Sequence, residues 1–545
     1  MDRNRAVWLP LVLAASLGTS ESAAQATLLA NEGLAAGDLF GACVLRVADV
    51  NGDLVPDLLV GAPNSSPSGA TNAGEIAVVS GANGVRLTTI PGSVALERFG
   101  SSLASLGDVT GDGVPEVAVG VPGAGGGLQT GAVRILNGFT FAPLGTIPGP
   151  STNARFGESV ASLDDVNGNG TLDLAVAAPG FNAISGATAG AVFVIDGGSG
   201  ATIRTFLGMA AFDALGTGLA AISDLNGDGK RDLLIGSPGF DSIAGSGAGR
   251  VRAVDPVSGS AVWTFDGPIA GESVGFAVDS TLDLNQDGLG DVVVGAPGAA
   301  PAGLSLAGRA YVLSGAGGAI LTTIDGLAAG DRLGSVVAGL ADLDADSRGE
   351  FAVASPDAQV NGNTGAGSVL VVRGGAFTPL YVFQGAVPHE GIGGLVADVG
   401  DINADGRPDF AIGSPLADGI AGANSGTLSV KAAQVGALTI DSTGKYGSPF
   451  TLKLQAMPSE PAFLFIDVAT GSFASPFGTI CVGLTPFLSI IPIGLVPPNG
   501  WWTSLGTIPP GGTLVAPFFL QAIVQEPGSA NGWRSSSCPT LVVGP

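Results

Sequence analysis

The residues best suited to chemistry in this sequence are the oxygen-bearing side chains of a nine-residue stretch, residues 224–232. Asp224, Asn226, Asp228 and Asp232 fall at its first, third, fifth and ninth positions. Calcium takes about six to eight oxygen ligands and is held by loops with carboxylates and amides at alternate positions, plus a carbonyl at position seven. Two glycines inside the stretch allow the backbone to turn tightly. The spacing therefore predicts a calcium-binding loop.

The same pattern occurs seven times, at intervals of 57 or 59 residues, and we number the copies loops one to seven. The predicted metal ligands are Asp49, Asn51, Asp53, Asp57, Asp108, Thr110, Asp112, Glu116, Asp165, Asn167, Asn169, Asp173, Asp224, Asn226, Asp228, Asp232, Asp283, Asn285, Asp287, Asp291, Asp342, Asp344, Asp346, Glu350, Asp401, Asn403, Asp405 and Asp409. A single copy would be explained equally well as an Asx-turn without metal. Seven copies at regular spacing favour calcium, although the number of loops that hold it stays open.

The loops differ in how strongly they predict a site. Their twelfth position, where an EF-hand places a bidentate Glu, is apolar, so they are not EF-hands. Loop three is the weakest candidate, because Asn169 replaces the fifth-position carboxylate. Loop six has four carboxylates and is expected to gain most from a bound cation.

Apolar segments on either side of each loop predict the elements that position it. Each repeat has a Phe-Gly-like dipeptide, an apolar segment, the loop, a segment that ends in a Gly-Ala-Pro-like tripeptide, and two further segments. Four strands in each of seven repeats predict a β-propeller. A solenoid fits the sequence less well, because it would need atypical capping repeats at both ends, whereas the first and last repeats here are ordinary. Residues 27–32 resemble a fourth strand, which the seventh repeat lacks, so they are expected to close the ring.

These motifs carry a family resemblance over roughly residues 27–435. The dipeptides Phe40-Gly41 and Phe99-Gly100, the tripeptides Gly61-Ala62-Pro63 and Gly295-Ala296-Pro297, and the acidic loops recur in a fixed order. The sequence resembles the FG-GAP repeat propellers of integrin alpha subunits and of many secreted bacterial proteins. The resemblance implies an all-β fold, a seven-bladed β-propeller that binds Ca2+ on one face, and a role in cell adhesion or recognition.

Both ends of the chain differ from the repeats. Residues 1–26 have a basic start, an apolar stretch and small residues, which predict a signal peptide and a secreted or cell-surface protein. Residues 436–545 have alternating apolar runs separated by prolines, which predict a C-terminal β domain of the β-sandwich type. Cys481 and Cys538 are expected to pair in an oxidising compartment, with two free thiols as the alternative.

Composition narrows the classes of partner. Hydrophobic residues make up 46% of the 545 residues, enough for large cores. The formal net charge of −25 argues against nucleic acid as a partner, although much of it belongs to the seven loops. After the signal peptide, no segment is long and apolar enough to predict a transmembrane helix. The oligomeric state is not predicted. Aromatic core packing is a better explanation than a sugar-stacking surface for the tryptophans of the C-terminal region, Trp501, Trp502 and Trp533.

Catalytic signatures are weak. The sole histidine, His389, precedes Glu390, whose acidic equivalents stand two residues before the dipeptide in other repeats, so a turn role is favoured over catalysis. No His/Cys cluster suggests zinc, and no carboxylate pair stands out for glycoside cleavage. The sequence therefore predicts a protein that is not an enzyme, a calcium-binding adhesion or recognition propeller. We expect it to bind a protein or glycan through variable loops opposite the calcium face, at residues 64–72, 181–189, 240–247 and 299–306. The alternative is an exported hydrolase or lyase, of phospholipase or polysaccharide-degrading type, on a propeller scaffold.

Overall fold

The computed structural model describes residues 27–432 in full and, within residues 433–545, the backbone of nine strands. The chain divides into two compact units, and the boundary along the sequence falls between Ala432 and Ala433. The predicted signal peptide, Cys481, Cys538 and Trp533 lie outside the described residues. In the described part of the chain, helical structure is confined to two short 3-10 turns, Pro67–Gly69 and Pro301–Gly303, and no helix is long enough to cross a bilayer.

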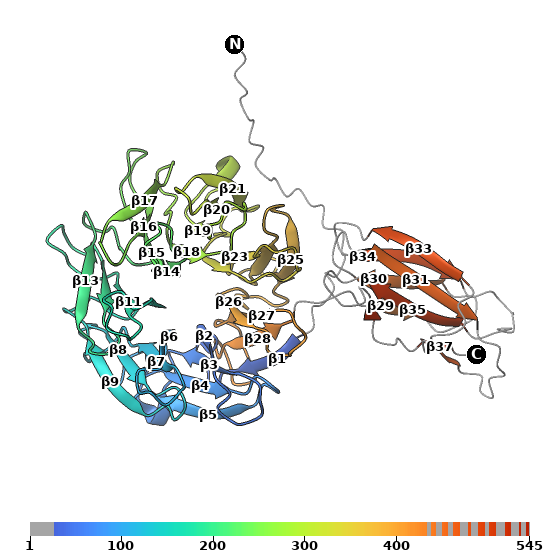
Figure 1. The fold of residues 1–545 in the computed structure, drawn as a ribbon, viewed down its shortest axis with the longest axis horizontal. Coiled ribbons are helices and arrows are strands. Elements are labelled where there is room, and N and C mark those ends of the chain that lie inside the picture. The colour runs from blue at the N-terminus through green and yellow to red at the C-terminus, as the bar shows by residue number, and fades with distance from the viewer. Residues whose placement is uncertain are drawn as a thin grey trace, which may run out of the picture. The chain divides into compact units, whose positions relative to one another are not determined.

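The first unit is a ring of seven four-stranded antiparallel sheets, or blades (Figure 1). Blades one to three consist of β2 (Cys43–Val47), β3 (Asp57–Ala62), β4 (Glu75–Val79) and β5 (Arg86–Pro91); β6 (Ser102–Gly107), β7 (Glu116–Gly120), β8 (Ala132–Leu136) and β9 (Pro143–Pro148); β10 (Val160–Ser162), β11 (Leu174–Ala178), β12 (Ala191–Ile195) and β13 (Thr202–Leu207). Blades four to six consist of β14 (Leu219–Ile222), β15 (Asp232–Ser237), β16 (Arg250–Val254) and β17 (Ala261–Asp266); β18 (Ala277–Ser280), β19 (Val292–Ala296), β20 (Arg309–Leu313) and β21 (Ile320–Asp325); β22 (Val336–Gly339), β23 (Phe351–Ser355), β24 (Ser368–Val372) and β25 (Pro379–Gln384). Blade seven consists of β26 (Leu395–Gly400), β27 (Asp409–Ser414), β28 (Thr427–Lys431) and β1 (Thr27–Glu32). The predicted seven-bladed propeller is confirmed.

The second strand of every blade is buried along its whole length. All six residues of β3 and of β15 are buried, whereas the outer strand β5 is partly exposed along its length. A strand covered on both faces by neighbouring blades needs apolar side chains on both faces, which explains why these segments read as continuous apolar runs. The core of the propeller therefore lies between adjacent blades, around their second strands.

The recurrent glycines mark a close contact between neighbouring blades. Gly236 of the tripeptide in blade four lies against the carbonyl of Gly275 in the dipeptide that leads to blade five, and a Cβ on Gly236 would lie 1.9 Å from that oxygen. Gly275 itself has a φ of 85°, a conformation that favours glycine. The dipeptide and tripeptide are thus two sides of one interface between blades.

The N-terminal strand closes the ring, as the sequence predicts. β1 pairs antiparallel with β28, in a register that places Leu29 opposite Val430, and the side chain of Leu29 is buried in the core between blades seven and one. Lys431 Nζ donates to Thr27 Oγ1 at 2.7 Å. On the inner side of the ring, β2 of blade one contacts β26 of blade seven. Blade seven therefore combines residues from both ends of the propeller sequence.

The second unit is also built of strands. Its described elements are β29 (Leu438–Ser442), β30 (Pro449–Gln455), β31 (Pro461–Val468), β32 (Gly478–Ile480), β33 (Ser489–Leu495), β34 (Trp501–Thr507), β35 (Phe518–Val524), β36 (Arg534–Ser535) and β37 (Leu541–Val543). They form sheets in the orders β29-β30-β34, β33-β31-β35-β36 and β32-β37. The β-sandwich stays a prediction, and the side chains of Trp501 and Trp502 lie outside the described residues.

Candidate metal centres

The seven predicted loops share one backbone conformation. Each joins the first strand of a blade to the second, so all seven lie on one face of the ring, which we name the loop face. Positions four and six have positive φ in every loop. Glycine favours this region, yet Gln286 and Ala345 adopt it at position four and Leu54 and Ser347 at position six. The loops thus keep the same backbone conformation even where a residue other than glycine must adopt a positive φ.

The first-position aspartate closes each loop by accepting backbone hydrogen bonds. Asp224 Oδ1 accepts from Gly227 N at 2.6 Å, and its Oδ2 accepts from Gly229 N at 2.7 Å. Asp49 makes the equivalent bonds in loop one. This is the bonding of an Asx-turn, which forms with or without metal. The first position alone therefore does not decide between a turn and a cation site.

The ninth-position carboxylates are more informative, because all seven are completely buried. They are Asp57, Glu116, Asp173, Asp232, Asp291, Glu350 and Asp409. Each accepts the backbone N–H of position two in its own loop, as Asp232 Oδ2 does from Leu225 N at 2.8 Å. An ionised carboxylate buried away from water is costly unless it is paired. Seven such groups at the base of seven loops favour a cation partner over a simple turn.

The loops differ in how closely they gather their carboxylates. In the described residues, carboxylate oxygens of Asp108, Asp112 and Glu116 in loop two lie within 4.8 Å of one another, and so do those of all four acids in loop six. In loops one and five an amide lies between the acids, since Asn51 Nδ2 donates to Asp53 and Asn285 Nδ2 to Asp287, both at 2.9 Å. The predicted ligands are thus brought together most tightly in loops two and six.

Unpartnered buried oxygens in loops six and seven suit a hard cation. Asp344 Oδ1, Glu350 Oε1 and Asp409 Oδ1 are buried and have no hydrogen-bond donor. The predicted side-chain ligands in all seven loops are oxygens, which suits calcium better than zinc or copper. When bound, a calcium ion would supply positive charge to these carboxylates. The ligands at positions one, three, five and nine, with the position-seven carbonyl, are the groups that would hold it.

Burial makes these carboxylates sensitive to pH when no cation is bound. It raises the pKa of Asp232, Asp291 and Asp409 to about 6 and that of Glu350 to about 9, against ordinary values of 3.8 and 4.5. Nearby carboxylates raise these pKa values further. A group whose pKa is higher in the folded than in the unfolded state stabilises the folded protein while it is protonated. This contribution is complete below the unfolded-state pKa and is lost as the pH rises through the folded-state pKa.

We therefore expect the melting temperature in chelator to fall between about pH 5 and about pH 8, and the calcium-induced rise in melting temperature to grow over the same range. Thermal melts at both pH values, with chelator and with calcium, measure this. A melting temperature in chelator that rises with pH would contradict the assignment of these buried acids as unpaired charges.

One position near each loop was missed by sequence reasoning. It directly follows the third strand of each blade, and we name it the turn position. Its residues are Ser80, Asn137, Asp196, Asp255, Ser314, Arg373 and Ala432. Asn137 Nδ2 donates to Asp112 Oδ2 at 2.7 Å, and Ser80 Oγ donates to Asp53 Oδ2 at 3.2 Å. The sequence does contain a signal for the turn position, because its residues recur with the same period of 57 or 59 residues as the loops.

The turn position changes the assessment of loop three. Asn167 Nδ2 and Asn169 Nδ2 both donate to Asp196 Oδ2, at 2.6 and 2.5 Å. Asp196 is buried, and it brings a third carboxylate to a loop whose own acids are Asp165 and Asp173. The weakest candidate in the sequence is thus supplemented by a carboxylate from another turn.

His389 lies in the connection between blades six and seven, on the face opposite the loop face, where it lines a pocket with Asp357 and Asp418. It is exposed, has a φ of 62°, and its backbone N donates to Thr364 O at 2.9 Å. The adjacent Glu390 accepts backbone bonds from Ala386 N and Val387 N, at 2.7 and 3.3 Å. Asp213 closes the equivalent turn in the same way. The predicted turn role of this recurrent acid is confirmed.

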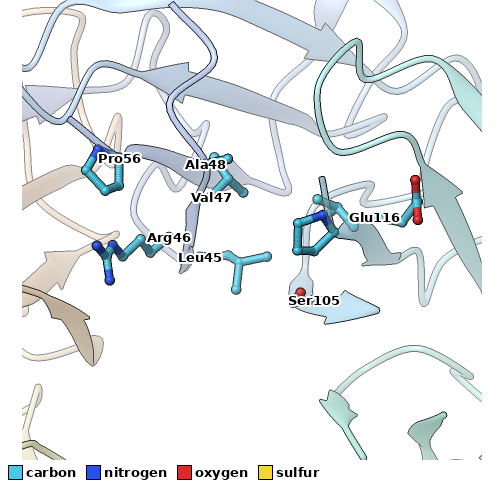
Figure 2. Close-up of a pocket in the computed structure, with 9 residues that line it drawn as sticks. Leu45, Arg46, Val47, Ala48, Pro56, Ser105 and Glu116 are labelled. Atoms are coloured by element: carbon cyan, nitrogen blue, oxygen red, sulfur yellow. The ribbon is translucent and has the colours of Figure 1, made fainter. Parts of the chain in front are cut away.

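A cavity of about 350 Å³ lies beside loop two, between the inner strands of blades one and two. Its lining is largely apolar and comes from β2, β6, the start of β7, and the ends of loops one and two. Figure 2 shows Arg46 and Leu45 on one side and Glu116 on the other, with the Glu116 carboxylate pointing away from them. Among the residues that line this cavity, none is therefore placed to act as an acid–base partner of the Glu116 carboxylate.

Comparison with known families identifies the repeats. The sequence model of the FG-GAP repeat matches residues 44–79, 99–136, 156–195, 215–254, 274–313 and 393–430. These ranges begin at or just after the first strand's dipeptide and end with the third strand. They fall on blades one to five and on blade seven.

Curated relatives include integrins and a phospholipase. Integrin alpha-PS5 of Drosophila melanogaster is 33% identical over 159 residues, which cover 27% of this chain and 16% of the relative. Integrin alpha-V of Gallus gallus is 29% identical over 228 residues, 39% of this chain and 22% of the relative. Phosphatidylinositol-glycan-specific phospholipase D of Homo sapiens is 30% identical over 358 residues, 57% of this chain and 42% of the relative. The chain spans less than half the length of each.

Proposed function

Because residues 27–432 form an FG-GAP repeat propeller similar to that of integrin alpha subunits, we propose that the protein is a calcium-dependent recognition module. It binds a protein ligand through the face opposite the loop face. The calcium loops hold the blades rigid, and the variable loops on the other face make the contact. A location outside the cell or on its surface belongs to the same proposal and rests on the predicted signal peptide.

The observation that carries the proposal is a set of exposed aliphatic side chains on this second face, which we name the recognition face. The loops between second and third strands must lie opposite the calcium loops, because neighbouring strands are antiparallel. Ile184, Ile243 and Ile420 occupy the same position in the loops of blades three, four and seven, and their side chains are 105%, 106% and 95% exposed. Fully exposed isoleucines at equivalent loop tips favour a binding surface.

Further apolar side chains lie in the loops that lead from one blade to the next, which reach the same face. They are Leu34, Val94, Leu96, Met209, Phe212, Ile269, Leu327 and Val387, all exposed. Such a surface suits the apolar groups of a protein partner, whereas sugars are usually stacked on aromatic rings. We therefore favour a protein over a glycan as the ligand. The predicted loops at 181–189 and 240–247 belong to this surface.

The test begins with an array of purified surface proteins and glycans, probed with the full chain in calcium and in chelator. Capture of a protein in calcium supports the proposal, and capture of a glycan alone would identify the other ligand class. Binding that is equal in chelator would contradict the role given to calcium.

We expect the combined substitution of Ile184, Ile243 and Ile420 by Ser to weaken capture of that protein by at least about tenfold, since loop-tip anchors dominate such contacts. Each exposed substitution should change the free energy of unfolding by no more than about 0.5 kcal/mol. Leu54→Ser is the matched control, because Leu54 is 91% exposed on the loop face and Ser347 holds its position in loop six. Unchanged capture by the triple variant would exclude these residues as the contact.

A second candidate is a propeller that supports a hydrolase. The similarity to the phosphatidylinositol-glycan-specific phospholipase D favours it. Release of a glycosylphosphatidylinositol-anchored reporter from vesicles by the purified chain would support this candidate. We favour the binding module, because the exposed apolar surface is explained by a ligand and not by catalysis.

A further inference from the structure

Loop six differs from the other loops in the charge of its turn position. Arg373 Nε donates to Asp344 Oδ2 at 2.9 Å, and its Nη1 donates to Pro379 O at 3.1 Å. The side chains of Arg373 and Asp344 are only 11% and 9% exposed. In blade five the same position is Ser314, whose Oγ donates to Asp287 Oδ2 at 3.0 Å. Blade six thus has a fixed, buried positive charge where blade five has a neutral hydroxyl.

This arginine is matched by a change inside the loop. Position three is Asp344 in loop six, whereas it is Asn285 in loop five and an amide or hydroxyl in every other loop. Blade six therefore carries one extra carboxylate at position three and one extra guanidinium at the turn position, and these two side chains bind each other. Because Arg348 also lies at position seven of loop six, the net charge of loop six with Arg373 is −2, one unit less negative than the −3 of loop five with its three carboxylates.

Arg373 occupies only one oxygen of Asp344. Asp344 Oδ1 and Glu350 Oε1 remain buried without a donor, and the four carboxylates of the loop lie within 4.8 Å of one another. From the next blade, Arg407 Nη1 donates to Leu343 O at 3.1 Å, which places another guanidinium beside the loop. Loop six can thus hold a cation through its free oxygens while it already contains a permanent positive group.

We infer that Arg373 is a built-in counter-cation of loop six, an inference that rests on the proposed calcium binding and deepens it. The guanidinium neutralises Asp344 at all times, so that loop six keeps its conformation when calcium is removed. Its charge also repels an incoming cation, so that loop six binds calcium more weakly than loop five. This reverses the expectation, drawn from the four carboxylates alone, that loop six gains most from calcium.

Hydrogen exchange resolved by peptide tests the first half of the inference, using the full chain in chelator. Residues 342–350 of loop six should retain amide protection that residues 283–291 of loop five lose. Arg373→Ser should remove the protection of loop six, and Arg373→Lys, which keeps the charge, should largely restore it. Equal loss of protection in both loops of the wild-type chain would overturn the inference.

Calcium titration by calorimetry tests the second half. Arg373→Ser should raise the affinity of one site by roughly tenfold, the effect of removing a single partly screened charge. The double variant Asp344→Asn with Arg373→Ser is the matched control, because it reproduces the pair found in blade five and leaves the net charge of loop six unchanged, so its affinity should stay below that of Arg373→Ser. An unchanged or lower affinity in Arg373→Ser, with a normal double variant, would overturn the weaker binding assigned to loop six.

The two proposals fail in different ways. If the wild-type chain binds no calcium at any loop, the proposed function fails, yet the exchange experiment in chelator still decides whether Arg373 holds loop six. If the other loops bind calcium and Arg373→Ser changes neither protection nor affinity, the inference about Arg373 fails alone.

Discussion

Removal of calcium should lower the free energy of unfolding of the propeller by on the order of 5 to 10 kcal/mol. A ligand at ten times its dissociation constant stabilises the folded state by roughly 1.4 kcal/mol for each site, and several loops contribute. The structural reason is the set of seven fully buried ninth-position carboxylates, which lack a counter-charge when the cation is absent. A loss of this size rivals the net stability of a typical domain.

Thermal melts in calcium and in excess chelator measure the effect, with magnesium as the control cation, because its smaller radius and octahedral preference suit these loops less well. Blade six should persist longest in chelator, since Arg373 remains bound to Asp344. An unchanged melting temperature on chelation would mean that the loops are Asx-turns, held by bonds such as that from Gly227 N to Asp224.

Deletion of residues 27–32 should destabilise blade seven by on the order of 5 kcal/mol or more and cause aggregation. The deletion removes the buried side chain of Leu29, comparable to a core truncation of about 2 to 5 kcal/mol. It also removes the backbone ladder between β1 and β28, at about 1 kcal/mol for each hydrogen bond. β28 would become an exposed edge, which templates association with other chains.

Two point variants separate packing from pairing. Leu29→Ala should lose the packing contribution alone, whereas Ala30→Ser, at an exposed position of the same strand, should have little effect. Denaturant melts and light scattering report stability and association. A deleted chain that stays monomeric and as stable as the wild type would show that β1 is not needed for closure.

The sequence predicts most of the fold, because its signals are local and repeated. Each loop, dipeptide and tripeptide lies within one repeat, and the period of 57 or 59 residues fixes the blades. Ring closure was also predictable, because the spare strand at residues 27–32 and the incomplete seventh repeat complement each other. What a single repeat cannot show is the packing of Gly236 on Gly275, since these residues belong to different blades.

The candidate site was predicted less completely for the same reason. Carboxylates in the nine-residue loops were evident, but the partner of Asp344 lies 29 residues later, at Arg373. Counting carboxylates within each loop therefore leaves out the guanidinium of Arg373 at loop six and the carboxylate of Asp196 at loop three. The loops that hold Ile184 and Ile243 were predicted from their variation between repeats, but the full exposure of these two side chains depends on packing that the sequence does not show.

The pairing of β1 with β28 also sets the order in which the propeller can be completed. Thr27 and Lys431 are 404 positions apart, so the first strand to be synthesised waits for nearly the whole propeller before its partner exists. At the usual rates of synthesis the early blades have time to form, while blade seven must remain open. A contact of such long range is slow to form, because the chain must first be brought back on itself. Completion of the ring is then the last step of folding, and until it occurs β1 and β28 are the unpaired edges that a chaperone would have to shield.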